Sequence, residues 1–311
     1  MTDIIVHQSN ELAQVDLDTV LTPLLYSLSD SSKRKYQHTF EMWKDFCADH
    51  GIQLYNFSAN NLVLFFESMD ASHSTKKNRL SHIRRLIQTI HAAMPGNEAI
   101  QSMYLQAKIL KIKRNSSDKE STRNKTALTK KEVYEALNVW QGTDPMELRN
   151  RAIIAILFYC GLRRSECASL KWSDINFEEE LLTVRHGKGD KERTIPILGE
   201  AEVINALEAW RERCAGREYI FCQVYKSGRL GDDTSVTPQA IYNVVQKTSD
   251  SINKKFAPHD ARRTLITQAL VSGSGVRDIQ FIAGHSRPET TLGYAQVKDA
   301  KEVKSRIKLK Y

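Results

Sequence analysis

The sequence predicts a mainly α-helical chain with a small antiparallel β-sheet, divided into a helical first part and an α+β second part. Apolar residues recur at helical spacing in both parts, as in helices that bury one face. A polar run over residues 115–126, without apolar periodicity, separates the parts. Two strand-like segments flank Gly-Lys-Gly-Asp-Lys at residues 187–191 and predict a β-hairpin.

The first part begins with residues 1–16, which carry no strong pattern and are expected to be a flexible arm. Helices are expected from residue 17 onward, and Ser29 offers an N-cap for one of them. A short apolar helix is expected over residues 61–69. Aromatic residues at helical spacing after the Ser29 cap favour core packing over base stacking. That stripe comprises Tyr36, Phe40, Trp43, Phe46 and Cys47.

The helix predicted after residue 74 has an apolar face and an otherwise basic surface. Its apolar positions are Leu80, Ile83, Leu86, Ile87 and Ile90. It carries five cations and no acidic residue: Lys76, Lys77, Arg79, Arg84 and Arg85. One interpretation is a solvated helix face. The other is a face that follows DNA phosphates, since cations that neutralise phosphates release counterions. The second part of the chain favours the DNA-binding interpretation.

The second part is expected to start near residue 127. Thr129, followed by Glu132 three positions later, is a capping box that begins a helix. A buried helix is expected to begin at Asp144-Pro145 and to end near Gly161, because it contains a continuous apolar segment.

Strands are expected over residues 181–185 and 192–197, on either side of the hairpin turn. Further helices are expected over residues 200–214, 259–271 and 276–283, with one more that Thr237 caps and Pro238 begins. The basic tail after Tyr294 carries Val297, Val303 and Ile307 on what we expect to be an amphipathic helix.

Composition limits the classes of protein that this chain can belong to. The formal net charge is +8 and the pI is about 9.1, which favours a polyanionic partner, nucleic acid first. Five scattered cysteines without a Cys-x-x-Cys pair indicate reduced thiols in a cytosolic protein. The N-terminus lacks the features of a signal peptide, and the apolar run over residues 152–160 is too short to span a bilayer.

Six residues suited to phosphate chemistry follow one another along the second part. They are Arg163, Lys188, His259, Arg262, His285 and Tyr294. Taken singly, each has an ordinary interpretation as a helix-terminal, turn, cap or packing residue, and Glu166 is equally an ordinary helix-surface carboxylate. Together they describe a site that holds a phosphodiester with cations and attacks it with a phenol.

The residue types fit that chemistry physically. Two guanidinium groups, those of Arg163 and Arg262, can hold phosphate oxygens through bidentate hydrogen bonds, which lysine cannot reproduce. His259 and Arg262 are three residues apart near a helix N-terminus, so they share a face and a phosphate-favouring position. Tyr294 is the expected nucleophile, because neighbouring cations can stabilise its phenolate.

This order of residues resembles the catalytic domain of the tyrosine recombinases, the phage integrase family. The resemblance covers roughly residues 125–300, and the helical part before it resembles the family's core-binding domain. The matching sequences are Gly-Leu-Arg-Arg-Ser-Glu (161–166), Gly-Lys-Gly-Asp-Lys-Glu-Arg (187–193), His-Asp-Ala-Arg (259–262), Gly-His-Ser (284–286) and Tyr294. Small departures occur beside the reacting groups, at Ala261, Arg263 and residues 265–267.

The resemblance implies a domain organisation of the two-domain type without a separate arm-binding domain. Residues 17–114 correspond to the DNA-binding core-binding domain, 127–294 to the catalytic domain and 295–311 to a tail that contacts a neighbouring subunit. It also implies that Lys188 protonates the leaving 5′ oxygen and that His285 hydrogen-bonds the scissile phosphate. His259 is expected to act as general acid/base or as a donor to the phosphate, and Glu166 to orient Arg163 or His259.

The resulting expectation is a site-specific DNA recombinase that works through a 3′-phosphotyrosyl intermediate, without metal or nucleotide cofactor. Its expected partners are double-stranded DNA, three further copies in a homo-tetramer on two DNA sites, and accessory DNA-binding proteins, with no membrane. Its expected location is the cytoplasm of a prokaryote, on the nucleoid when bound. Integration, excision, inversion and resolution of a mobile element stay open as tasks. The alternatives are a type IB topoisomerase-like enzyme, a telomere resolvase and a non-catalytic DNA-binding relative.

Overall fold

The computed structural model describes residues 17–113, 127–185, 192–284 and 288–292. The chain forms two compact units, divided between Thr122 and Arg123, and each unit has its own hydrophobic core. The predicted arm, linker, hairpin turn and C-terminal tail lie outside the described residues. No helix in the described part of the chain is both long enough and apolar enough to cross a membrane.

The only regular secondary structure in the described residues of unit 1 is helical. Its helices are α2 (Leu17–Tyr26), α3 (Asp30–His50), α4 (Ala59–Ser68), α5 (His73–Ala93) and α6 (Glu98–Ile109). Trp43 is 1% exposed, stacks on Phe57 and donates from its indole nitrogen to the Leu54 carbonyl at 2.8 Å. The aromatic stripe of α3 therefore packs in the core, as predicted, and so does the apolar face of α5.

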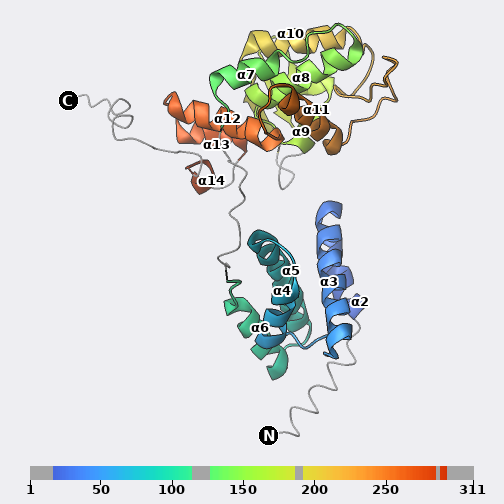
Figure 1. The fold of residues 1–311 in the computed structure, drawn as a ribbon, viewed down its shortest axis with the longest axis vertical. Helices are drawn as coiled ribbons and strands as arrows, with labels where there is room; N and C mark the ends of the chain where they lie inside the picture. Colours follow the sequence, from blue (N-terminus) through green and yellow to red (C-terminus); the bar gives the residue numbers. More distant parts are fainter. Residues whose placement is uncertain (1–16, 114–126, 186–191, 285–287, 293–311) are drawn as a thin grey trace, which may run out of the picture. The chain divides into compact units, whose positions relative to one another are not determined.

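Unit 2 combines eight described helices with a small sheet. Its helices are α7 (Lys130–Leu137), α8 (Pro145–Tyr159), α9 (Arg164–Ala168), α10 (Glu200–Arg211), α11 (Pro238–Ser251), α12 (Pro258–Val271), α13 (Val276–Ala283) and α14 (Pro288–Leu292), with a 3₁₀ turn, η1 (Trp172–Asp174). Helix α8 is buried, as its apolar sequence predicted, and it contacts α7, α10, α11 and α12 (Figure 1). It is the central element of this unit.

The sheet has three antiparallel strands in the order β1-β2-β3. They are β1 (Ile175–Asn176), β2 (Leu181–Val184) and β3 (Arg193–Pro196). Strands β2 and β3 form the predicted hairpin, with Leu182 opposite Ile195. Strand β1 was not predicted, because two residues cannot show an alternating pattern. The predicted fold class, mainly α with a small antiparallel sheet, is confirmed.

Side-chain caps lie at the starts of several described helices, among them α7 and α11. Thr129 Oγ1 accepts from the Glu132 backbone N–H at 3.2 Å, and the Glu132 carboxylate accepts from the Thr129 backbone N–H at 2.7 Å. This is the predicted capping box. Thr237 Oγ1 accepts from the Ala240 N–H at 3.2 Å, with Pro238 in the first helical position, also as predicted.

The turn between α8 and α9 determines where Arg163 lies. Gly161 adopts a φ of +60°, and a Cβ there would lie 2.6 Å from Leu265 Cδ2, so the position requires glycine. The chain then enters α9, with Arg163 as its N-terminal flanking residue. Arg163 therefore lies at the start of α9 and not at the C-terminal end of α8. The short α9 follows α8 almost at once, and five residues are too few to show a helical period.

Candidate active site

Three arginines that are far apart in the sequence meet at the C-terminal end of α13. Arg163 Nη2 donates to the carbonyl of residue 284 at 3.1 Å, and Arg193 Nε donates to that of residue 282 at 3.3 Å. Arg262 Nη2 donates to the carbonyl of residue 283. The last carbonyls of a helix lack partners within the helix and carry partial negative charge. This arginine cluster (Arg163, Arg193 and Arg262) therefore caps α13 immediately before His285.

A buried carboxylate joins two members of the arginine cluster. The Glu166 side chain is 1% exposed. Its Oε1 accepts from Arg163 Nη1 at 2.6 Å and from Arg193 Nη1 at 3.1 Å. Its Oε2 accepts from Arg193 Nη2 at 3.0 Å and from the Arg163 backbone N–H at 2.8 Å. Arg193 thus grips the carboxylate with both terminal nitrogens, the strongest geometry for such a pair.

Competing effects act on the ionisation of Glu166. Burial by itself raises the pKa of its carboxyl group, whereas the hydrogen bonds from Arg193 and from the Arg163 backbone lower it, as do both positive charges. The net result is a pKa below the ordinary value, so Glu166 is ionised at neutral pH. The carboxylate and its two arginines form one charged unit.

Arg262 and Arg163 differ in exposure. Arg262 is 1% exposed, and its Nη1 donates to the Gly161 carbonyl at 2.8 Å, so it ties the end of α8 to the end of α13. The Arg163 side chain is 26% exposed and reaches solvent. Of the two predicted phosphate-binding arginines, Arg163 is thus the one that a ligand can reach directly.

His259 lies in the first turn of α12, three residues before Arg262. It is exposed, yet partial removal from water lowers the pKa of its imidazole. The positive charges of Arg262, Arg263 and Arg163 also lower this pKa, against an opposing effect of Asp260. The neutral imidazole is therefore the form present at neutral pH, and it lies within electrostatic range of the arginine cluster.

The structure thus brings together four residues that the sequence selected: Arg163, Glu166, His259 and Arg262. Lys188, His285 and Tyr294 lie outside the described residues. Described residues adjoin two of these in the sequence. Strand β3 begins at Arg193, five residues after Lys188, and α13 ends at Ala283, two residues before His285.

Sequence reasoning assigned no role to Arg193. It appeared only as the last residue of the Gly-Lys-Gly-Asp-Lys-Glu-Arg run, where one more cation beside a basic turn attracts no attention. Its side chain is 9% exposed, which is unusual for arginine without an acidic partner. The partner, Glu166, is 27 residues away. The only sequence signal was the place of Arg193 on a predicted strand. Which carboxylate the side chain binds is seen only in the folded structure.

The predicted DNA-binding cations all lie on α5. Lys77 and Arg85 are exposed, and Lys76 is partly exposed.

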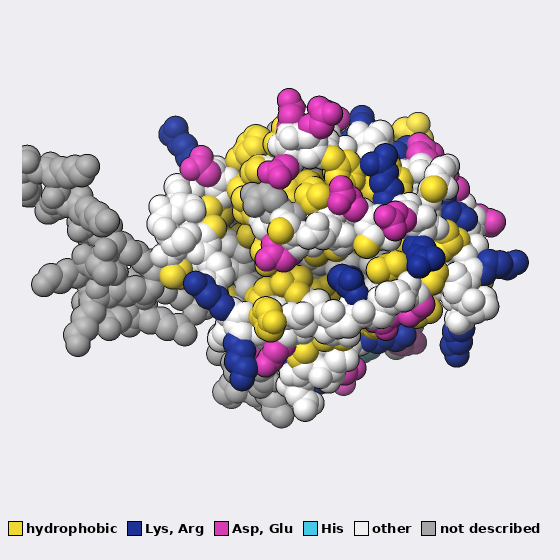
Figure 2. All heavy atoms as spheres, turned by 90° about the horizontal axis from the view of Figure 1, so that it is seen from above, with side chains coloured by type: hydrophobic (Ala, Val, Ile, Leu, Met, Phe, Trp, Pro, Cys, Tyr) yellow, Lys and Arg dark blue, Asp and Glu magenta, His cyan; other side chains and the backbone are white. Residues whose placement is uncertain are grey.

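Figure 2 shows one face of the molecule, on which Lys and Arg side chains stand apart among acidic and apolar ones. The positive charge of the chain is thus not gathered into one continuous patch on that face.

Arg84 and Arg79 make contacts with residues outside α5, whereas Arg85 Nη1 donates to Gln88 Oε1 of the same helix at 3.2 Å. Arg84 Nε donates to the Ala107 carbonyl at 2.7 Å, and its Nη2 donates to the Leu110 carbonyl, so it caps α6. Arg79 Nη1 lies 3.4 Å from Met69 Sδ. Lys77 and Arg85 are therefore better placed than Arg79 and Arg84 to reach a phosphate.

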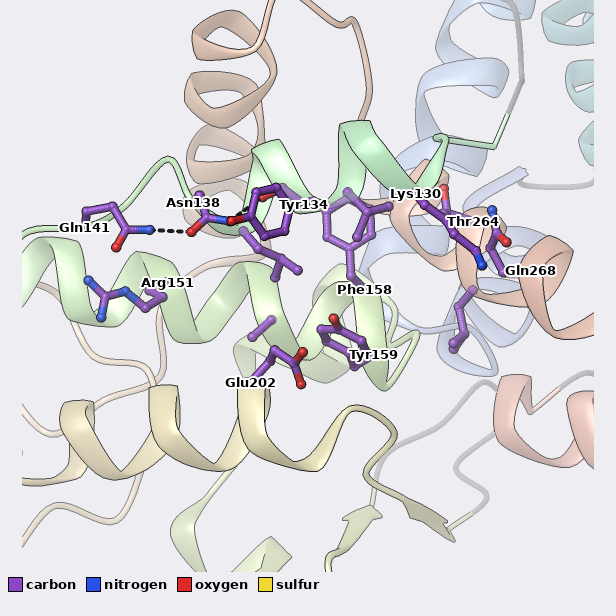
Figure 3. A pocket seen from close by; sticks show the side chains of 14 residues that line it. Lys130, Tyr134, Asn138, Gln141, Arg151, Phe158, Tyr159, Glu202, Thr264 and Gln268 are labelled. Carbon is purple, nitrogen blue, oxygen red and sulfur yellow. Dashed lines mark hydrogen bonds between the residues drawn. The ribbon is translucent and has the colours of Figure 1, made fainter. Parts of the chain in front are cut away.

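A cavity of about 630 Å³ lies between α7, α8, α10 and α12 and is separate from the arginine cluster (Figure 3). Val133, Leu137 and Phe158 contribute its apolar lining, and Tyr134 stands beside them. Among the described residues, no group of three or more His, Cys, Asp or Glu side chains is placed to hold a metal ion.

Comparison with known proteins identifies the family. The model of the phage integrase family matches residues 126–301, more than half of the chain. The chain belongs to the phage integrase family. The resemblance seen in the sequence is confirmed by this match, which includes the arginine cluster, Glu166 and His259 as well as residues 285–294.

Relatives with similar sequences are tyrosine recombinases by name. The chain is 34% identical over 172 residues to tyrosine recombinase XerA of Thermococcus onnurineus, a match that covers 55% of this chain and 58% of the relative. It is 34% identical over 183 residues to XerA of Pyrococcus furiosus, covering 58% and 60%. The matches thus span less than two thirds of either relative.

Solved structures share the fold over nearly the full length. The site-specific recombinase XerH, bound to a palindromic difH substrate in a post-cleavage complex, matches with a TM-score of 0.72 at 19% identity. This match covers 98% of this chain and 88% of XerH. The Tn1549 transposon integrase with circular intermediate DNA matches with a TM-score of 0.67 at 17% identity, covering 95% of this chain and 100% of the integrase. At these identities the likeness concerns the fold.

We predict that Arg193→Met destabilises unit 2 by about 3 kcal/mol or more at neutral pH, because it removes one partner of a buried ion pair. Urea unfolding followed by tryptophan fluorescence measures this loss. Arg193→Lys, which keeps the charge without the fork, should lose less. Adding Glu166→Gln to Arg193→Met should recover part of the stability, because the uncompensated carboxylate is removed. A loss in the double variant equal to the sum of the single losses contradicts the pairing.

We predict that His259 titrates below pH 6.5 in the folded protein and that Arg263→Gln raises its pKa, since a nearby positive charge is removed. An NMR titration of the imidazole Cε1–H signal measures both values. Because the folded-state pKa is the lower one, the folded state loses stability relative to the unfolded state as pH falls through this range. A wild-type value above 6.5 contradicts the electrostatic arrangement described above.

Proposed function

We propose that this protein is a site-specific DNA recombinase that cuts and rejoins strands through a covalent 3′-phosphotyrosyl intermediate. The observation that carries the proposal is the position of Arg163 and Arg262 at the end of α13, directly before His285, in a member of the phage integrase family. The charges of both arginines act on His259. The family's relatives named as tyrosine recombinases lend support.

The proposed reaction exchanges one phosphodiester for another. The Tyr294 oxygen attacks the scissile phosphorus, the bond to the 5′ oxygen breaks, and that oxygen takes a proton from Lys188. The phosphate then links Tyr294 to the 3′ end of the strand. A 5′ hydroxyl of a second strand attacks this link and gives its proton to Lys188. The released Tyr294 oxygen takes a proton from His259, and a DNA backbone is restored. Since one phosphodiester bond replaces another at each step, the cycle needs no nucleotide or metal cofactor.

Arg163 is proposed to hold the phosphate oxygens during the attack. A guanidinium group has five N–H donors, and Glu166 and the carbonyl of residue 284 account for one on each terminal nitrogen of Arg163. The remaining donors are proposed to bind the phosphate, since the side chain is 26% exposed. Arg262 is 1% exposed, so its contact with a phosphate requires a local opening around it.

His259 is proposed to accept the proton of the Tyr294 phenol. A base must be unprotonated before it acts, and the lowered pKa of His259 keeps its imidazole neutral at physiological pH. His285 is proposed to hydrogen-bond the scissile phosphate. Glu166 acts through Arg163 as a positioning residue.

The two units are proposed to divide the work on double-stranded DNA. Unit 1 would serve as the core-binding domain, with Lys77 and Arg85 on phosphates, and unit 2 as the catalytic domain, joined by residues 115–126. Recombination between two sites calls for a homo-tetramer, with accessory DNA-binding proteins selecting the outcome. The proposed setting is the cytoplasm of a prokaryote, where the substrate is a mobile element.

The tail 295–311 is proposed to contact a neighbouring subunit. Its apolar residues recur at helical spacing, and the cavity of Figure 3 offers an apolar lining of matching chemistry. Removal of the tail should then weaken assembly on DNA without affecting the folding of unit 2.

We predict that Tyr294→Phe binds duplex DNA but forms no covalent adduct. The substitution removes only the attacking oxygen, so binding persists. A nicked suicide duplex carrying the native recombination site traps the adduct, and denaturing electrophoresis detects it. Tyr311→Phe is the matched control and should form adduct at the wild-type rate. Adduct formation by Tyr294→Phe would contradict the assignment of Tyr294 as the nucleophile. Relaxation of arbitrary plasmids without recombinant product would favour a topoisomerase-like activity instead.

We predict that Arg163→Ala slows adduct formation by about 10²–10³-fold, the loss typical for one oxyanion donor, equivalent to ~3–4 kcal/mol. Single-turnover cleavage of the suicide duplex measures the rate. Arg164→Ala is the control, since Arg164 is exposed and next in sequence. Because Arg163 also pairs with Glu166, thermal unfolding should be measured in parallel. An unchanged rate in folded Arg163→Ala counts against the phosphate contact.

A further inference from the structure

A second buried arginine of unit 2 has no carboxylate beside it. Arg149 lies on α8 and is 9% exposed. Its Nε and Nη2 donate to Asn150 Oδ1 at 3.3 and 3.1 Å, and its Nη1 donates to the Cys222 carbonyl at 3.0 Å. All three acceptor contacts are to neutral groups. In the described part of the chain, Arg149 forms no ion pair, in contrast to Arg193 with its Glu166.

The environment of Arg149 leaves its charge uncompensated. Burial lowers its pKa, and the effect of the Cys222 side chain in the opposite direction is the smaller one. A guanidinium group nevertheless remains protonated in proteins. A buried charge costs free energy unless an opposite charge accompanies it. Of its five N–H donors, the three hydrogen bonds use three, which leaves one on each terminal nitrogen.

Arg149 lines a cavity of about 530 Å³. Its lining includes a second cation, Lys247, and no acidic residue. The other polar lining residues are Asn150, Gln223, Thr234, Ser235, Thr237 and Asn243. Lys247 and Asn243 are exposed, so the cavity opens to solvent. We refer to it as the α8–α11 pocket, after the two contacting helices that supply both cations (Figure 1).

The start of α11 adds to the positive character of the α8–α11 pocket. Thr237 is its N-cap, and Ala240 in the first turn also lines the cavity. The N-terminal end of a helix carries partial positive charge and favours anions. Three independent features therefore have the same sign here: the unpaired Arg149 charge, the exposed Lys247 ammonium and the end of a 14-residue helix.

We propose that the α8–α11 pocket binds a backbone phosphate of duplex DNA, distinct from the scissile phosphate. The two remaining N–H donors of Arg149 match two oxygens of a phosphate group, and Lys247 supplies a second charge at the rim. None of the residues of the arginine cluster lines the pocket. The assignment of this phosphate to DNA rests on the proposed function. The prediction that the pocket binds an anion is independent of that function.

The first experiment counts the phosphates that the protein neutralises. Affinity for a duplex of arbitrary sequence is measured against salt concentration, in the Tyr294→Phe background to prevent cleavage. Loss of one phosphate contact lowers the slope of log K against log salt by about 0.9. Lys247→Gln should show this drop, and Lys131→Gln, an exposed lysine of α7, should keep the wild-type slope. An unchanged slope in Lys247→Gln overturns the proposal.

The second experiment identifies the source of the anion without replacing the buried Arg149. Backbone amide signals of Thr237 and Asn243 are followed by NMR during addition of duplex DNA and, separately, of inorganic phosphate. The proposal is supported if the duplex shifts these signals and if inorganic phosphate binds more weakly or is displaced by the duplex. Shifts caused by phosphate that duplex fails to displace would assign the pocket to a free anion and overturn the DNA contact. Absence of shifts with either overturns the site.

These outcomes are separable from those that test the proposed function. If the protein forms no adduct on a suicide duplex but Lys247→Gln loses one salt-dependent contact, the pocket proposal stands and the recombinase assignment is wrong. If the protein forms the adduct but both lysine variants keep the wild-type salt slope, the recombinase assignment stands and the pocket proposal is wrong.

Discussion

The arrangement of the candidate active site depends on one buried carboxylate. Glu166 is ionised inside unit 2, and such a charge is tolerated only where cations and hydrogen bonds surround it. Arg163 and Arg193 fill that role, and doing so fixes the direction in which each guanidinium group points. Arg163 is thereby held in one orientation while its side chain stays 26% exposed. A phosphate-binding group that is oriented before its ligand arrives loses less freedom on binding.

The second constraint is the end of α13. The carbonyls of residues 282–284 have no partners within the helix. The arginine cluster supplies donors to them from the residue before α9, from β3 and from α12. Segments more than 100 residues apart are thus joined at the residues that precede His285. The same contacts link strand β3 to Arg163 through Arg193 and Glu166. The start of α9, the start of β3, the first turns of α12 and the end of α13 are therefore joined by one network of charges and hydrogen bonds.

How much the sequence could predict depended on how local each signal was. The capping box at Thr129, the start of α11 at Thr237 and the buried α8 follow from neighbouring residues, so sequence rules sufficed. Arg163, His259 and Arg262 were found because the family order is distinctive. By contrast, Arg193 and Arg84 owe their roles to partners distant in sequence: Glu166 for the first and the end of α6 for the second. A basic residue in a basic segment gives no local sign that it is structural.

The coupling through Glu166 is open to a direct kinetic test. Single-turnover adduct formation on a suicide duplex would be measured for Glu166→Gln, Arg193→Met and the double variant. If Arg193 acts through Glu166 on Arg163, the double variant should lose about as much rate as the more impaired single variant, with duplex binding retained in all three. Losses that multiply would mean that the two side chains act independently, which contradicts a site organised around one buried carboxylate.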